Sequence, residues 1–202
     1  MSDAALRLSG IACVRGGRML FRDVDLALER GGSALLRGPN GVGKSSLMRL
    51  CAGLLRPFAG TIERRGRIAL ADERLALDTE QPLRAALGFW ARLDGADAAM
   101  LDQGLEAMAL RPLADVPVRM LSTGQRKRAA LARVVASGAP IWLLDEPGNG
   151  LDDASLALLG AAVADHLAAG GIVLAASHQP LPLSAAVTID LTTHVPEEAI
   201  CG

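Results

Sequence analysis

The chain has 202 residues, 50% of them hydrophobic, and 21 basic and 22 acidic residues that leave a net charge of −1. This length is enough to bury the core of one compact domain, and the near-neutral charge excludes an overall positive field that would attract nucleic acid or anionic lipid. The three cysteines, Cys13, Cys51 and Cys201, have no paired or metal-ligand spacing, which favours reduced thiols over a disulfide framework.

Neither a secretion signal nor a membrane span is predicted. The first ten residues contain no basic region followed by a long apolar core. The most apolar stretch, residues 167–176, is interrupted by two glycines and falls well short of the roughly 20 apolar residues that cross a bilayer. We therefore expect any membrane function to depend on another subunit.

The apolar pattern predicts an α/β fold. Residues 5–30 alternate apolar and polar positions around a Gly-Gly pair, which is typical of an antiparallel hairpin at the edge of the structure. Apolar residues recur at helical spacing between 78 and 115, which indicates an inserted helical subdomain. Short apolar runs alternate with helical patterns and predict buried parallel strands at 33–37, 67–70, 140–145 and 171–177.

A glycine-rich segment follows the strand predicted at 33–37 and precedes a helical run. This context is typical of a P-loop, in which successive backbone N–H groups point at phosphate oxygens. Lys44 would reach the β- and γ-phosphates, and the Ser45 hydroxyl would ligate Mg²⁺. A chance glycine turn is the plain alternative, and the matching strand and helix disfavour it. The segment consists of Gly38, Pro39, Asn40, Gly41, Val42, Gly43, Lys44, Ser45 and Ser46.

Two acids, Asp145 and Glu146, end the apolar strand predicted at 140–145. Carboxyl ends of parallel strands share one edge of a sheet, so both carboxylates should lie beside the P-loop. Asp145 is then a candidate Mg²⁺ ligand, and Glu146 is a candidate to orient or deprotonate an attacking water. Taken alone, two such acids are more often a helix cap or a solvated turn.

The segment LSTGQ, residues 121–125, precedes a long helical run. Ser122 and the following backbone amides would form a helix N-terminus suited to an anion. In isolation this is an ordinary capped helix.

The four segments GPNGVGKSS, LSTGQ, LLDEP and the later His178 stand in the order found in ATP-binding cassette (ABC) proteins, and the chain resembles this family over nearly its whole length. The resemblance implies that residues 1–202 form one ABC-type P-loop ATPase domain, with a mainly parallel sheet, an antiparallel β edge and a helical subdomain at about 78–135. It implies ATP and Mg²⁺ as cofactors and a head-to-tail homodimer. In that dimer Ser122, Gly124 and Gln125 complete the partner's nucleotide site.

The same resemblance assigns two further elements. Residues 149–152 would form the loop that crosses the dimer interface, and His178 would be the switch histidine at the γ-phosphate. A satisfied histidine at a strand end is the plain alternative for His178.

Two positions depart from the family pattern. Glu73 stands where a glutamine that senses Mg²⁺ is usual, which makes it a candidate metal contact, and Gln81 lies farther along the chain than that glutamine. Arg15 stands where an aromatic residue usually stacks on adenine, and its planar guanidinium could stack on the base instead. The basic cluster Arg126, Lys127, Arg128 and Arg133 is interpreted as a solvated surface on the nucleotide side rather than a nucleic-acid site.

Among cassette proteins the chain is most similar to the CcmA family, the ATP-binding subunits of the haem exporter of cytochrome c biogenesis. The residues that carry this similarity are GGIVLAASHQPL at 170–181 and the segment 121–147 with Thr123 at a glycine position. The similarity implies integral membrane partner subunits, a peripheral location on the cytoplasmic face of the inner membrane, and no direct binding of haem by this chain.

Three other functions stay open at this stage. The first is the ATPase of another small-substrate ABC transporter, and the second is a soluble cassette ATPase that acts on DNA or ribosomes. The third is a catalytically silent binding module in which nucleotide only drives dimerisation. The second usually carries a coiled-coil insertion or two cassettes in one chain, which this sequence does not show. The third is disfavoured by the intact Lys44, Asp145, Glu146 and His178.

Overall fold

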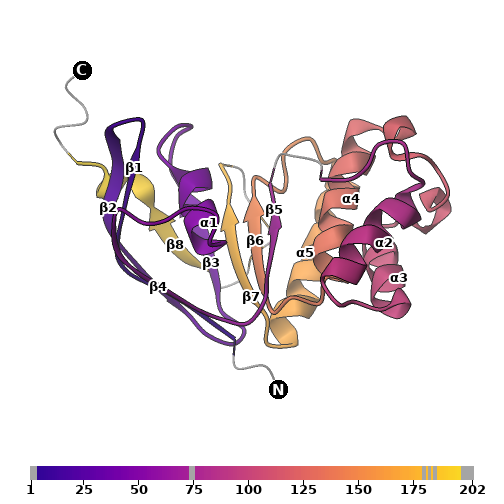
Figure 1. The fold of residues 1–202 in the computed structure, drawn as a ribbon, viewed down its shortest axis with the longest axis horizontal. Coiled ribbons are helices and arrows are strands. Elements are labelled where there is room, and N and C mark those ends of the chain that lie inside the picture. Colours follow the sequence, from indigo (N-terminus) through magenta and orange to yellow (C-terminus); the bar gives the residue numbers. More distant parts are fainter. Residues whose placement is uncertain (1–3, 73–75, 179–180, 182, 184–185, 197–202) are drawn as a thin grey trace.

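In a computed structural model of the chain, two sheets and a layer of helices stack side by side (Figure 1). The structure describes residues 4–72, 76–178, 181, 183 and 186–196. Among these residues, no helix combines the length and the apolar character needed to cross a bilayer.

The first sheet is antiparallel and has the order β2-β1-β4. Strands β1 (Ala5–Arg15) and β2 (Arg18–Leu28) form the hairpin predicted from the two glycines, with Arg15 opposite Arg18 at the turn. Strand β4 (Ala59–Arg65) pairs with the other edge of β1. Strand β4 has no apolar signal in the sequence because nearly all of its side chains are exposed, so backbone pairing defines it instead.

The second sheet is parallel and has the order β5-β6-β7-β3-β8. The strands predicted from apolar runs are all present, within one residue of the expected bounds. Strand β8 was not predicted, because its short sequence VTID carries little apolar signal. The five strands are β3 (Ser33–Arg37), β5 (Ile68–Ala71), β6 (Ile141–Asp145), β7 (Ile172–Ala176) and β8 (Val187–Asp190).

Alternation along the parallel strands divides the interior into two cores. On β6, Ile141 and Leu143 face the core shared with the antiparallel sheet and helix α1 (Lys44–Cys51), whereas Trp142 and Leu144 face the helical layer. Both faces are therefore buried, as expected for a parallel sheet.

The helical layer lies on the side of the parallel sheet away from the antiparallel sheet, and the region predicted as a helical subdomain, 78–135, supplies most of it (Figure 1). Its longer helices are α2 (Leu83–Leu93), α3 (Ala98–Ala107) and α4 (Thr123–Ala136), and α5 (Asp153–Ala168) follows β6. Three short 3₁₀ turns complete the described elements: η1 (Arg111–Leu113), η2 (Val118–Met120) and η3 (Leu191–His194).

Candidate functional site

The glycine-rich loop connects β3 to the first residue of α1. Gly43 has φ +117°, and a Cβ there would lie 2.8 Å from the ring of Phe21 on β2. Only glycine fits this left-handed backbone beside the aromatic ring. The hairpin therefore helps to shape the loop, which places the N-terminus of α1, with its partial positive charge, at the carboxyl end of β3.

Lys44 opens α1 and is almost fully buried. Its ammonium donates a hydrogen bond to the carbonyl of Gly38 at 2.9 Å and a longer one to that of Pro39 at 3.4 Å. It also lies 3.6 Å from Oε1 of Glu146. A buried cation needs such acceptors, so the loop and Glu146 together hold Lys44 in place.

Glu146 follows the last residue of β6 and has φ +50°, an uncommon backbone conformation for a residue with a side chain. Its N–H donates to the carbonyl of Ala176 on β7 at 2.8 Å, which fixes this strained turn to the neighbouring strand. Oε2 lies 2.9 Å from Nδ1 of His178, just beyond β7. The nearly buried carboxylate thus bridges Lys44 and His178, and strain of this kind is found at functional sites.

A cavity of about 350 Å³ opens between these groups at the carboxyl ends of the parallel strands. Leu20 on β2 forms part of its wall, a position the sequence did not suggest because only the fold of the hairpin brings it there. Ser45 and Asp145 supply hard oxygen donors of the kind that Mg²⁺ prefers. The described lining residues are Leu20, Asn40, Gly41, Gly43, Lys44, Ser45, Ser46, Asp145, Glu146, Asn149 and His178.

Several residues considered from the sequence are not among the described residues that line this cavity: Gly38, Pro39 and Val42 of the loop, Arg15, and Gln81. Arg15 is exposed at the turn between β1 and β2 and is absent from the described lining. Glu73 lies outside the described residues. Gln81 is exposed, and its carbonyl accepts a hydrogen bond from the N–H of Val118 within the helical layer.

The segment LSTGQ also lies apart from the cavity within this chain. Ser122 caps α4 and forms a capping box with Gln125: the N–H of Gln125 donates to Ser122 Oγ at 3.2 Å, and the N–H of Ser122 donates to Gln125 Oε1 at 2.8 Å. A Cβ on Gly124 would lie 3.7 Å from the carbonyl of Gly150. The exposed start of α4 therefore borders the loop that begins at Asn149.

The loop from Asn149 to Asp152 joins the cavity to α5. Asn149 lines the cavity. Asp152 caps α5 by accepting a hydrogen bond from the N–H of Ser155 at 2.8 Å, and hydrogen bonding from Ser155 lowers the pKa of the Asp152 carboxyl. The side chain of Asp152 is thus engaged in holding the helix start.

The basic cluster on α4 is not the solvated surface expected from the sequence. All four side chains are half-buried. Arg126 donates to the carbonyl of Arg119, Arg128 to that of Met108 and Arg133 to that of Leu70. Three of these guanidinium groups therefore donate to backbone carbonyls of other segments, which a charge pattern alone does not reveal.

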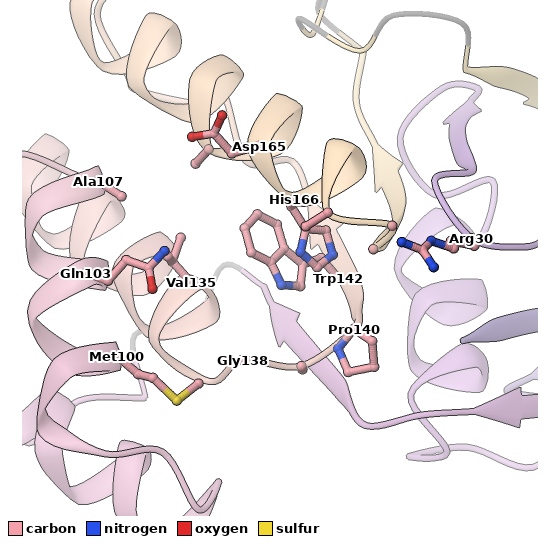
Figure 2. Close-up of a pocket in the computed structure, with 15 residues that line it drawn as sticks. Arg30, Met100, Gln103, Ala107, Val135, Gly138, Pro140, Trp142, Asp165 and His166 are labelled. Atoms are coloured by element: carbon pink, nitrogen blue, oxygen red, sulfur yellow. The ribbon is translucent and has the colours of Figure 1, made fainter. Parts of the chain in front are cut away.

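A second cavity, of about 400 Å³, lies near the start of β6 and β7, at the edge of the sheet opposite the phosphate loop. Trp142 and His166 both line it, and their rings stack with centroids 3.8 Å apart and an interplanar angle of 10° (Figure 2). Met100 faces it from α3 and Arg30 from the opposite side (Figure 2). Although larger, it contains none of the residues predicted to bind phosphate or metal, whereas the cavity around Lys44 contains most of them.

Comparison with known proteins agrees with this geometry. Residues 21–149 match the model of the family described as ABC transporter. The chain is 62% identical to the cytochrome c biogenesis ATP-binding export protein CcmA of Sphingopyxis alaskensis, over 88% of this chain and 92% of that protein. It is 55% identical to the protein of the same name from Novosphingobium aromaticivorans, over 97% of this chain and the whole of that protein.

Among solved structures, an ABC transporter ATP-binding protein from Pyrococcus furiosus superimposes with a TM-score of 0.82. The alignment covers 95% of this chain and all of that one, at 23% identity. At this identity the likeness shows the fold alone, and that fold is the predicted one.

Proposed function

Because the chain belongs to the ABC transporter family, among the ATP-binding export proteins of cytochrome c biogenesis, we propose that it hydrolyses ATP to drive a haem exporter. The observation that carries the ATPase part is the nearly buried Glu146 carboxylate between Lys44 and His178, in a cavity that also contains Asp145 and Ser45. The export part rests on the printed names of the relatives.

ATP binding exchanges the partner of Lys44. The triphosphate would lie along the backbone N–H groups of residues 38–46, where the start of α1 favours negative charge. The Lys44 ammonium, now 3.6 Å from Glu146, would turn to the β- and γ-phosphates. Glu146 is then free to hold a water molecule in line with the γ-phosphorus.

Hydrolysis then needs one proton acceptor. Glu146 would take a proton as the water oxygen bonds to the γ-phosphorus and the bond to the β-phosphate oxygen breaks, which leaves ADP and phosphate. His178, at 2.9 Å from Glu146, would hold the carboxylate in place and contact the γ-phosphate. Ser45 and Asp145 would hold Mg²⁺, which neutralises charge on the phosphate oxygens when bound.

A head-to-tail homodimer would complete the site. Ser122, Gly124 and Gln125 lie outside the cavity of their own chain, although the start of α4 is suited to an anion. In the proposed dimer they face the γ-phosphate of the partner's nucleotide, and residues 149–152 cross between the two sites. Arg15 is proposed to stack on adenine, and Glu73 to contact the metal.

Transport requires membrane subunits, because this chain acts as an ATPase and no described helix spans a bilayer. We place the cassette dimer on the cytoplasmic face of the inner membrane, bound to integral membrane partners. Haem would be handled by those partners rather than by this chain.

The test replaces the chromosomal gene with a copy that encodes the wild type, Lys44→Ala or Arg7→Ala. Two quantities are measured: the haem-stained c-type cytochromes, and the ATPase activity of the complex with its membrane subunits. Arg7 is an exposed cation on β1 and serves as the control. We expect Lys44→Ala alone to abolish both. If Lys44→Ala loses ATPase activity but makes normal cytochromes, the assignment as an ATPase stands and the assignment to haem export is refuted. Full ATPase activity in Lys44→Ala would refute the assigned nucleotide site.

A further inference from the structure

Arg133 joins three elements of the fold. It lies on the half-buried side of α4, and its guanidinium Nη2 donates a hydrogen bond to the carbonyl of Leu70 near the end of β5. The same guanidinium lies 4.9 Å from the ring centroid of Trp90 on α2, within the range of a cation–π contact. One side chain therefore ties two helices of the helical layer to the edge strand of the parallel sheet.

Trp90 extends this connection. Its indole N–H donates to the carbonyl of Ala76, which lies between β5 and α2. The Arg133–Trp90 pair thus contacts Leu70 on β5 and Ala76 in the connection that leads from β5 to α2. Burial lowers the pKa of Arg133, and Asp94 and Asp72 act in the opposite direction. The guanidinium nevertheless stays charged at neutral pH because its ordinary pKa is so high.

Arg128 also donates to backbone carbonyls, but its acceptors belong to the helical layer and not to the sheet. It lies on the same helix, and its Nη1 donates to the carbonyl of Met108 at 2.8 Å and to that of Ala109 at 3.4 Å. Both acceptors directly follow α3, so Arg128 fixes α4 within the helical layer. Arg133, by contrast, fixes α4 to the sheet.

The far end of α4 has its own anchor on the sheet. Arg67, just before β5, donates to the carbonyls of Ser137 at 3.0 Å and Gly138 at 3.2 Å, directly after α4 ends. With this anchor alone, α4 could still pivot about its C-terminal end. A helix of 14 residues is about 21 Å long, and a tilt of about 10° moves its other end by roughly 3–4 Å. The same tilt moves the backbone of Arg133, which lies about 6 Å from the pivot, by roughly 1 Å. That shift is enough to lengthen its hydrogen bond to Leu70 beyond the normal range.

We propose that Arg133 is a positioning residue that fixes the tilt of α4 against β5 and so sets where Ser122 stands when two cassettes close on ATP. This inference rests on the proposed dimer function. The group acts through the helix and has no contact of its own with the nucleotide cavity described above.

The test uses the full chain with Glu146→Gln, in which slow hydrolysis lets ATP-bound dimers accumulate. Arg133→Met, Arg133→Lys and the matched control Arg128→Met are introduced into this parent. Three quantities are compared: the affinity of the monomer for a fluorescent ATP analogue, the ATP concentration that dimerises half of the chains in analytical ultracentrifugation, and the melting temperature.

For Arg133→Met we expect the half-dimerisation concentration of ATP to rise about tenfold or more, since a hydrogen bond to a charged group is lost. Monomer affinity for the analogue should stay within about twofold of the parent, because the Lys44 site is untouched. Arg133→Lys should be intermediate, as an ammonium keeps the charge without the planar stacking group. Arg128→Met should melt at a lower temperature yet dimerise like the parent.

Unchanged dimerisation in Arg133→Met, or an equal defect in Arg128→Met, would overturn the positioning role and leave the proposed function standing. A parent that never dimerises with ATP would refute the proposed dimer itself, and the inference with it. Should Arg133→Met not fold, the comparison of Arg133→Lys with Arg128→Met decides by the same criterion.

Discussion

Glu146→Gln should separate two tasks of the Glu146 carboxylate, which forms an ion pair with Lys44 and is proposed to activate water once ATP is bound. The two side chains are only 11% and 7% exposed, and their charged atoms lie 3.6 Å apart. At an effective dielectric constant of about 20, their Coulomb attraction is roughly 5 kcal/mol before desolvation is subtracted. Glutamine keeps an oxygen acceptor but removes the charge, so Lys44 becomes a buried cation with neutral partners only.

The expected cost in the absence of nucleotide is about 2–3 kcal/mol, below the range for complete removal of a buried partner because the glutamine oxygen remains. In a domain of this size such a loss lowers the melting temperature by roughly 4–12 °C. ATP supplies the missing negative charge, so it should stabilise the variant more than it stabilises wild type. Turnover should fall by about 100-fold or more, because no general base remains.

Differential scanning fluorimetry with and without ATP measures the first effect, and phosphate release measures the second. Glu80→Gln is the matched control, since Glu80 is an exposed carboxylate paired with Arg119 on the surface. It should change neither quantity appreciably. The reasoning is refuted if Glu146→Gln melts like wild type without nucleotide and keeps more than about a tenth of wild-type turnover.

Gly43→Ala should abolish ATP binding in an equilibrium assay, because the residue has φ +117° and its methyl group would lie 2.8 Å from Phe21; normal binding would contradict this account of the loop. Burial lowers the pKa of His166 from 6.5, so the unfolded chain binds more protons and wild type should lose stability as pH falls below about 6.5. His166→Phe keeps a ring beside Trp142, and its melting temperature should change less between pH 7.5 and 5.5; an equal pH dependence would exclude His166 as the source. Burial raises the pKa of Cys51 to about 12, so its thiol should react with iodoacetamide at pH 8 only after denaturation, as peptide mass spectrometry can establish; labelling in the folded chain would show that the thiol is accessible.

The parts of the fold that the sequence predicts are those with a local signal. The phosphate loop, the strand that ends at Asp145 and the hairpin at Gly16–Gly17 each lie within a short run whose residue types match its conformation. Strand β4 has no such signal because pairing with β1 defines it and its side chains face outward.

The cavity around Lys44 shows the same division. The placement of Lys44, Asp145 and Glu146 together follows from the rule that parallel strands present their carboxyl ends at one edge. The wall formed by Leu20 depends on how the antiparallel sheet packs beside the loop, which no run of residues encodes. The anchoring roles of Arg128 and Arg133 were also hidden, because their acceptors lie 20 and 63 residues away along the chain.

The capping box at the start of α4 means that two backbone N–H groups at this end of the helix already have hydrogen-bond partners within the single chain. One of them, the backbone N–H of Gln125, belongs to a residue proposed to face the partner's phosphate, and it already donates to Ser122 Oγ. A phosphate group would have to displace an internal acceptor rather than fill a vacancy, and a neutral hydroxyl yields to a multiply charged anion more readily than it does to water. In the proposed dimer, the nucleotide of the second chain would be the anion that takes the place of Ser122 Oγ at this N–H.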